Sequence, residues 1–155
     1  MTEPDLATGI GRHMAALDEV INDPAAIIYV RDAVGRYVWV SDSYGRHLPH
    51  TREQVIGKSN RDLYGDAAKN WEIADALTRI NRDFMVTCED MYDARPGWRR
   101  WRKFVATKLM VTIDDVPYLV GISVEVRDVH AEKYEQRLGQ LRARIIERMG
   151  PLDGS

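Results

Sequence analysis

Residues Ile28–Tyr64 read IYVRDAVGRYVWVSDSYGRHLPHTREQVIGKSNRDLY. Two apolar runs, 27–31 and 36–40, predict short strands because they are rich in β-branched and aromatic residues. The polar run Asp32–Gly35 between them predicts a tight turn, since aspartate can bond the backbone just ahead of it and glycine tolerates a positive φ. Strand pairs of this kind build a sheet and seldom catalyse a reaction alone. We therefore expect the function to lie in what the sheet and its neighbouring helices enclose.

Short helices are predicted directly after this hairpin. Ser41 or Asp42 is expected to cap a first helix over residues 44–48. Thr51–Gln54 forms a capping box, in which each of the two terminal side chains accepts a hydrogen bond from the other residue's backbone amide. Gly57 follows at the position where a helix commonly ends in a left-handed residue. These helices are expected to lie on one face of the sheet.

A longer helix is predicted to run from Asp66, its expected cap, to about Ile80. Ile73, Leu77 and Ile80 recur at steps of three and four residues, so they share one helix face. Asn81 is expected to close the helix in the left-handed conformation.

The second half of the chain predicts three more strands, over residues 84–93, 98–112 and 118–126. Pro96-Gly97 suits the central positions of a type II turn, and Asp114-Asp115 marks the next turn. The order of elements predicts an α+β fold. Its centre is a five-stranded antiparallel sheet with helices on one face, flanked by an N-terminal and a C-terminal amphipathic helix.

The two terminal helices are predicted over residues 6–21 and 131–145. The apolar residues of the second alternate at three- and four-residue steps, like the seam of a coiled coil, and a seam this short needs a partner. Each stripe is expected to be exposed on a monomer, which predicts a homodimer. The expected organisation is a flanking helix (1–23), a central domain (24–128), and a signalling helix with a tail (129–155). The predicted dimer contacts are Leu6, Ile10, Leu17, Tyr134, Leu138, Leu141 and Ile145.

The composition is ordinary for one globular domain in the cytoplasm. Of the 155 residues, 45% are hydrophobic and 30% are charged, which is enough to bury a core. A net charge of −2 gives no reason to expect nucleic acid or an anionic membrane as a partner. No apolar run approaches the roughly 20 residues of a spanning helix, and no signal peptide is recognisable, so membrane insertion is not expected. Cys88 is the only cysteine, which excludes an internal disulfide and a multi-cysteine metal site.

Four segments together resemble the PAS domain, a sensory module of bacterial signalling proteins. They are Tyr29–Asp32, Gly35–Val40, Arg52–Lys58 and Leu119–Val124, and they match the family's D-x-x-G-r hairpin, its r-E-e-v-i-G-k helix end and its closing G-i-s strand. Each motif alone is weak, but their order and spacing are specific, and the similarity covers residues 24–138. The resemblance implies a PAS-like fold that holds a ligand between the sheet and the longer helix.

The chain departs from the PAS pattern where signals leave the domain. Glu125-Val126-Arg127 replaces the Asp-Ile-Thr signature that often joins the last strand to the signalling helix, so the acid is kept and the threonine is lost. The resemblance assigns signal coupling to Glu125, Arg127 and Asp128. Ser41 stands where asparagine is usual, and Asp115 stands where a turn glycine is usual.

The resemblance leaves the cofactor unknown. Light-sensing flavin domains need a cysteine in the short helix after Gly57-Lys58, but the corresponding run Ser59–Leu63 has none, and Cys88 lies on a predicted strand. Haem-binding members usually place an axial histidine on the longer helix, and residues 66–82 contain none. These differences argue against a photochemical flavin adduct and against haem.

His47 and His50 stand close enough in sequence to share one face. Without a neighbouring carboxylate or cysteine they form a weak metal site, so surface or capping roles are the simpler interpretation and no metal ligand is assigned. Ser41-Asp42-Ser43 with His47 superficially suggests a nucleophile and a base. Because the glycine-flanked elbow and the oxyanion donors are missing, no catalytic residue is assigned either.

The run Trp98–Phe104, WRRWRKF, mixes bases and aromatics as single-stranded nucleic-acid platforms do. The preceding strand segment Cys88–Asp93 is acidic at the facing positions, so opposite charges across a hairpin are the simpler account. A third interpretation is that an inward arginine holds a ligand carboxylate bidentately.

Aromatic residues are expected to surround a pocket between the sheet and the helices. Such residues fill a core at least as often as they line a cavity, so both interpretations stay open. The predicted lining is Tyr29, Trp39, Tyr44, Trp71, Trp101, Phe104 and Ser123.

Three functions are compatible with these patterns. The first is a non-enzymatic sensory and dimerisation module that binds an unknown small molecule and passes the signal through its C-terminal helix. Because the chain stops at Ser155, it is expected to be a piece of a larger receptor or a standalone regulator of a downstream protein, in two-component or cyclic-nucleotide signalling. The second is a protein-interaction scaffold whose pocket is filled by its own tryptophans. The third, a small α+β enzyme, lacks an evident acid–base pair.

Overall fold

The computed structural model describes residues 12, 14–15, 26–93, 96–97, 99–126 and 131–149. Most of the predicted helix over residues 6–21 lies outside these ranges. The same holds for Leu6, Ile10 and Leu17 of the predicted dimer contacts, and for Arg127 and Asp128 of the predicted signal-coupling residues.

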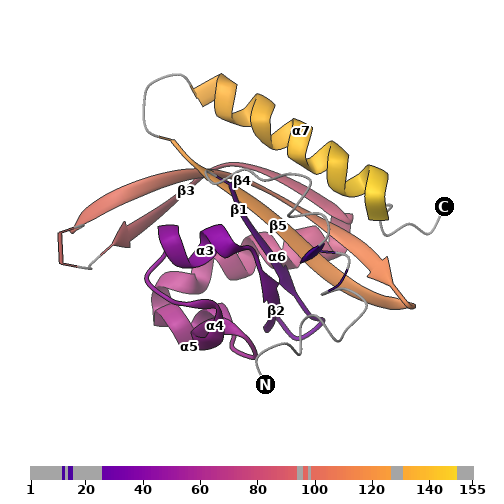
Figure 1. Ribbon diagram of the computed structural model, residues 1–155, viewed down its shortest axis with the longest axis horizontal. Coiled ribbons are helices and arrows are strands. Elements are labelled where there is room, and N and C mark those ends of the chain that lie inside the picture. Colours follow the sequence, from indigo (N-terminus) through magenta and orange to yellow (C-terminus); the bar gives the residue numbers. More distant parts are fainter. Residues whose placement is uncertain are drawn as a thin grey trace.

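The centre of the fold is an antiparallel sheet of five strands in the order β2-β1-β5-β4-β3. This confirms the predicted sheet. The two strands at the end of this order, β4 and β3, form a long hairpin that extends past the helices (Figure 1). The strands are β1 (Ala26–Arg31), β2 (Tyr37–Val40), β3 (Asp83–Asp93), β4 (Arg100–Ile113) and β5 (Val116–Glu125).

Helices cover both faces of the sheet, so the fold has three layers (Figure 1). One face carries α3 (Asp42–His47), α4 (Arg52–Val55), α5 (Asn60–Tyr64), the 3₁₀ helix η1 (Gly65–Ala68) and α6 (Lys69–Asn81). The other face carries α7 (Ala131–Met149), which contacts β4 and β5.

The predicted turn chemistry is present in the first hairpin and in α4. The Asp32 carboxylate accepts hydrogen bonds from the backbone amides of Val34 and Arg36, each at 3.0 Å, and Gly35 has a φ of 89°. Thr51 and Gln54 form both hydrogen bonds of the capping box. Hydrogen bonds from side chains to nearby backbone amides therefore fix the β1–β2 turn and the start of α4, as the sequence predicts.

Three predicted helix ends are wrong. Ser41 precedes α3 but gives it no side-chain cap, because its hydroxyl accepts a hydrogen bond from the Ile28 amide of β1 at 3.0 Å. Asp66 lies in η1, one turn before α6, and Arg82 rather than Asn81 takes the left-handed conformation, with a φ of 70°. Tertiary contacts and a 3₁₀ turn therefore override the local signals.

The apolar face predicted on α6 faces away from the sheet. Ile73, Leu77 and Ile80 are 51%, 38% and 74% exposed, whereas the small residues Ala74 and Thr78 are buried. Small side chains on the inner side let the helix approach the sheet closely.

The C-terminal helix packs on its own chain. Leu138, Leu141 and Ile145 are at most 1% exposed and belong to the hydrophobic core on the outer sheet face, with Tyr134 packed beside them. The expectation that this stripe is exposed on a monomer is therefore wrong. A three-and-four periodicity identifies an apolar stripe but does not say whether a second chain or the same sheet covers it. Met14 joins the same core.

Candidate functional site

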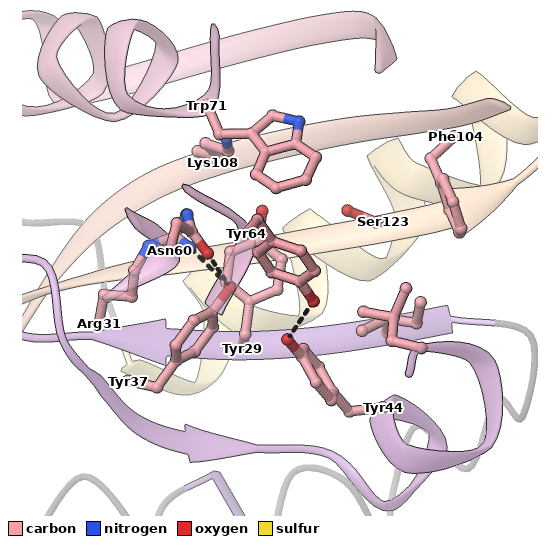
Figure 2. A pocket seen from close by; sticks show the side chains of 12 residues that line it. Tyr29, Arg31, Tyr37, Tyr44, Asn60, Tyr64, Trp71, Phe104, Lys108 and Ser123 are labelled. Atoms are coloured by element: carbon pink, nitrogen blue, oxygen red, sulfur yellow. Dashed lines mark hydrogen bonds between the residues drawn. The ribbon is translucent and has the colours of Figure 1, made fainter. Parts of the chain in front are cut away.

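A cavity lies between the inner face of the sheet and the helices α3, α5 and α6 (Figure 2). Its volume is about 70 Å³. Five of the seven predicted lining residues surround it, namely Tyr29, Tyr44, Trp71, Phe104 and Ser123. The other lining residues are Ile27, Arg31, Tyr37, Leu48, Asn60, Tyr64 and Lys108.

Trp39 is buried on the opposite, outer face of the sheet. A register shift in the β1–β2 pair places Arg31 opposite Tyr37, while Val30 stays opposite Trp39. The extra residue of this bulge, Val38, breaks the alternation of side chains. Tyr37 therefore lines the cavity and Trp39 does not, although a regular strand would put both on one face.

Trp101 is also outside the cavity and is 71% exposed. It lies near the start of β4, in the hairpin with β3. Side chains alternate along a strand, so Arg102 and Phe104 share the inner face while Trp101 points the other way.

The sequence prediction missed the most polar part of the lining. Arg31 and Lys108 are at most 1% exposed, and Asn60 is 5% exposed. Alternation contained the signal for two of them, since Arg31 follows Tyr29 by two residues and Lys108 follows Phe104 by four. Their charge argued against an inward position, because buried lysine and arginine are rare unless paired.

Arg31 is held on three sides. Its Nη2 donates to Asp75 Oδ1 at 2.8 Å, and its Nη1 donates to the Tyr37 hydroxyl at 3.0 Å. The guanidinium lies over the rings of Tyr29 and Tyr37, 4.6 and 5.1 Å from their centroids. Lys108 Nζ approaches the same Asp75 oxygen at 3.4 Å. One carboxylate from α6 therefore meets two buried cations from the sheet.

Tyrosine hydroxyls supply further polar groups of the cavity (Figure 2). The Tyr37 hydroxyl donates to Asn60 Oδ1 at 2.5 Å, and the hydroxyls of Tyr44 and Tyr64 are 3.2 Å apart. Burial raises the pKa of both the Tyr37 and the Tyr44 phenol. Both therefore remain protonated at neutral pH and can act as hydrogen-bond donors.

The floor of the cavity depends on a glycine. Gly121 lies directly opposite Tyr29 in the β1–β5 pair. A Cβ atom at position 121 would lie 2.1 Å from Tyr29 Cζ, so the Tyr29 ring occupies the space that any side chain would need.

Glu125 forms a buried pair with Arg102. Arg102 Nε and Nη2 donate to the two carboxylate oxygens at 2.9 and 3.0 Å, and Nη1 donates to the His47 carbonyl of α3. The carboxylate that this inward arginine holds bidentately is therefore Glu125. The backbone register also places Asp90 opposite Lys103 and Asp93 opposite Arg100, as expected for opposite charges across the hairpin.

His50 and the run after Gly57 adjoin the cavity through the lining residues Tyr64 and Asn60. The His50 ring packs edge-to-face on Tyr64, with 5.3 Å between centroids, and burial lowers its pKa, helped by the charge of Lys58. Ser59 caps α5 through a second capping box with Asp62. In the described ranges, no group of three potential ligands is placed to hold a metal ion, and no helix is long and apolar enough to cross a membrane.

Solved structures with this arrangement include PAS and LOV domains. The Rhodobacter sphaeroides LOV protein superposes with a TM-score of 0.60 at 20% identity, over 86% of this chain and 82% of that one. A PAS domain from a two-component sensor histidine kinase gives a TM-score of 0.55 at 14% identity, over 74% and 97%. A sensory box sensor histidine kinase from Vibrio cholerae gives 0.52 at 10%, over 77% and 96%.

Neither a protein-family model nor a curated protein sequence matches the chain. The likeness is therefore one of architecture. Its basis is the five-stranded sheet with α3 to α6 on its inner face, which reproduces the arrangement expected from the four sequence segments. The chain has the fold of the PAS domain family.

Proposed function

We propose that the protein is a sensory signal-transduction module of the cytoplasm, which binds a small molecule in the cavity and does not catalyse a reaction on it. The observation that carries this proposal is the lining itself. It combines aromatic rings with buried hydroxyl, amide and cationic groups, as ligand sites do. The Ser41 and Ser43 hydroxyls are engaged with β1, where they bond the Ile28 amide and the Ala26 carbonyl, which supports binding without nucleophilic catalysis.

The relay of the signal is proposed to run through the sheet. Phe104 and Lys108 of β4 line the cavity, while the alternate residues Val105 and Leu109 belong to the core that contains Leu141 of α7. A ligand that shifts the inner side chains thus also changes the surface on which α7 packs. An output domain or a downstream signalling protein would then respond to α7.

Glu125 is proposed to couple these events, together with Arg127 and Asp128. It ends β5 just ahead of the connection to α7, and its partner Arg102 also bonds α3. The Arg102 guanidinium lies 5.2 Å from the ring centroid of Phe104, a cavity residue. A movement of Phe104 can therefore reach Glu125, just ahead of α7, through the single side chain of Arg102.

The first test is an absorption spectrum of the purified protein, with mass spectrometry before and after denaturation. A matched pair of variants on β5 gives the control. Ser123→Phe fills the cavity, whereas Val116→Phe adds the same ring at a position that is 44% exposed. We expect the wild type and Val116→Phe to release a small molecule, or to gain thermal stability from one in a metabolite screen. Ser123→Phe should do neither.

The alternative function is a ligand-free interaction scaffold. The observation that favours it is the small volume of the cavity, about 70 Å³, against the roughly 300–1,000 Å³ of ordinary ligand pockets. Two negative results together would decide for the scaffold: the wild type releases no small molecule, and no metabolite stabilises it more than Ser123→Phe.

A further inference from the structure

Two buried cations line the cavity. The Arg31 and Lys108 side chains are 2% and 1% exposed, and the described lining residues include no aspartate or glutamate. Burying positive charge away from water is costly unless an anion is close. The cavity wall is therefore electrostatically suited to a negatively charged ligand.

The carboxylate that contacts these cations, that of Asp75, lines a neighbouring groove and not the cavity. Asp75 is 14% exposed and lines a groove of about 250 Å³ between the β1–β2 turn, the start of α5, and α6. Asn60 lines both the groove and the cavity. The Arg31–Asp75 pair and Asn60 therefore separate the cavity from a groove that solvent reaches.

The groups that would recognise an anion are already in position. Contacts with the Tyr29 and Tyr37 rings hold the plane of the Arg31 guanidinium, and such a planar group binds carboxylates with high geometric specificity. Lys108 adds a second charge, and the Tyr37 hydroxyl lies beside Arg31. The volume of about 70 Å³ compares with the roughly 30 Å³ that one water takes up in the liquid, so a carboxylate with a short tail fits.

Building on the function proposed above, we infer that the cavity binds the carboxylate of a small organic acid between Arg31 and Lys108, in place of Asp75. The ligand and Asp75 carry the same charge, so they compete for the same two cations. Binding releases Asp75, and with it the ionic contacts of α6 to β1 and β4. Arg79 keeps its hydrogen bond to the Asp32 carbonyl at 2.7 Å, so the C-terminal part of α6 remains attached to the turn.

Thermal unfolding with small carboxylates and their amides tests this inference. Asp75→Ala removes the competing carboxylate and should lower the Tm. Sodium acetate should then raise the Tm of Asp75→Ala by about 3–5 °C for each tenfold increase above its Kd. Sodium chloride at equal ionic strength and neutral acetamide should not. The wild type should respond only at higher acetate concentrations, because Asp75 competes.

Glu72→Ala is the matched control, since Glu72 is on the same helix and pairs with the exposed Arg61; acetate should not restore its Tm. Asp75→Asn repeats the experiment with a side chain of equal shape, should Asp75→Ala not fold. Equal stabilisation by acetate and acetamide would overturn the anion inference and leave a ligand-binding cavity. An acetate effect no larger than that of chloride, in both Asp75 variants, would also overturn it, while ligand release from the wild type would still uphold the proposed function.

Discussion

The Tyr29 ring lies across Gly121 of the neighbouring strand and shapes the floor of the cavity. An alanine Cβ there would overlap ring atoms that Phe would retain. We therefore expect Gly121→Ala to lower the free energy of unfolding by about 1–3 kcal/mol, the usual cost of overpacking a core.

A double-mutant cycle in urea checks this expectation. Tyr29→Leu removes the ring, so Gly121→Ala should cost little in that background, whereas Tyr29→Phe should give no relief. If the cost is the same in all three backgrounds, the Tyr29 ring is not its cause.

The Arg102–Glu125 pair is almost completely buried, with side chains 0% and 7% exposed. Glu125→Gln leaves the arginine charge without its carboxylate, and we expect it to lose about 3–5 kcal/mol of unfolding free energy. The double variant Arg102→Met with Glu125→Leu should recover much of that loss, because two apolar side chains replace the pair. Chemical denaturation of the three proteins measures both effects, and an unchanged Glu125→Gln protein would contradict the pairing.

The sequence prediction named Tyr29, Phe104 and Ser123 as lining residues, and all three lie on the inner face. It was wrong for Trp101, because it did not apply the alternation of side chains that puts Trp101 and Phe104 on opposite faces of β4. It failed at Trp39, because a one-residue bulge gives no signal in a run of apolar residues. It also missed Arg31 and Lys108, whose partner Asp75 lies far away in sequence.

At the scale of elements, α7 is a structural part of the domain. Leu141 is fully buried in the core between α7 and the outer face of the sheet, whereas Gln140 next to it is exposed. We expect Leu141→Ala to reduce the unfolding free energy by about 2–5 kcal/mol and Gln140→Ala to change it little. Circular dichroism in urea measures both variants.

The molecular mass of the same two variants, measured by light scattering, distinguishes packing of α7 on its own sheet from a dimer seam. The expected result is an unchanged mass for Leu141→Ala at concentrations where it is folded. A halved mass together with a stable fold would restore the seam.

Helix ends were predictable where a side chain closes its own turn, as at Thr51 and Gln54. They were not predictable where the same side chain has a tertiary alternative. The Ser41 hydroxyl, a good cap by type, bonds β1 instead. The exposed face of α6 shows the same limit, since periodicity correctly grouped Ile73, Leu77 and Ile80 but could not tell which way they face.

At the scale of the whole molecule, acid is expected to weaken the fold through His50. Its pKa is below the ordinary value of 6.5 in the folded protein because of burial and Lys58. Between the folded pKa and 6.5 the unfolded chain therefore binds more protons than the folded one, and stability falls as the pH is lowered through this window. Urea titrations at pH 7.5 and 5.5 should show a smaller loss for His50→Gln than for the wild type. An identical loss would mean that other groups are responsible.

The order of strands and helices was enough to predict the sheet, because each turn carries its own residue signature. The third layer was not predictable in the same way. A stripe such as Leu138, Leu141 and Ile145 satisfies a partner chain and an open sheet face equally well. Only the three-dimensional structure shows that the outer face of β1, β4 and β5 is available to it.

The burial of α7 makes its release a competition between binding partners. If the helix leaves, Val105, Leu109, Ile122 and their neighbours meet water, and exposure of that much apolar surface promotes association. A downstream protein that captures α7 must therefore act at a concentration high enough to displace the sheet as a binding partner, or must cover the vacated face itself. By mass action, the response would then depend on the abundance of that protein as well as on the ligand.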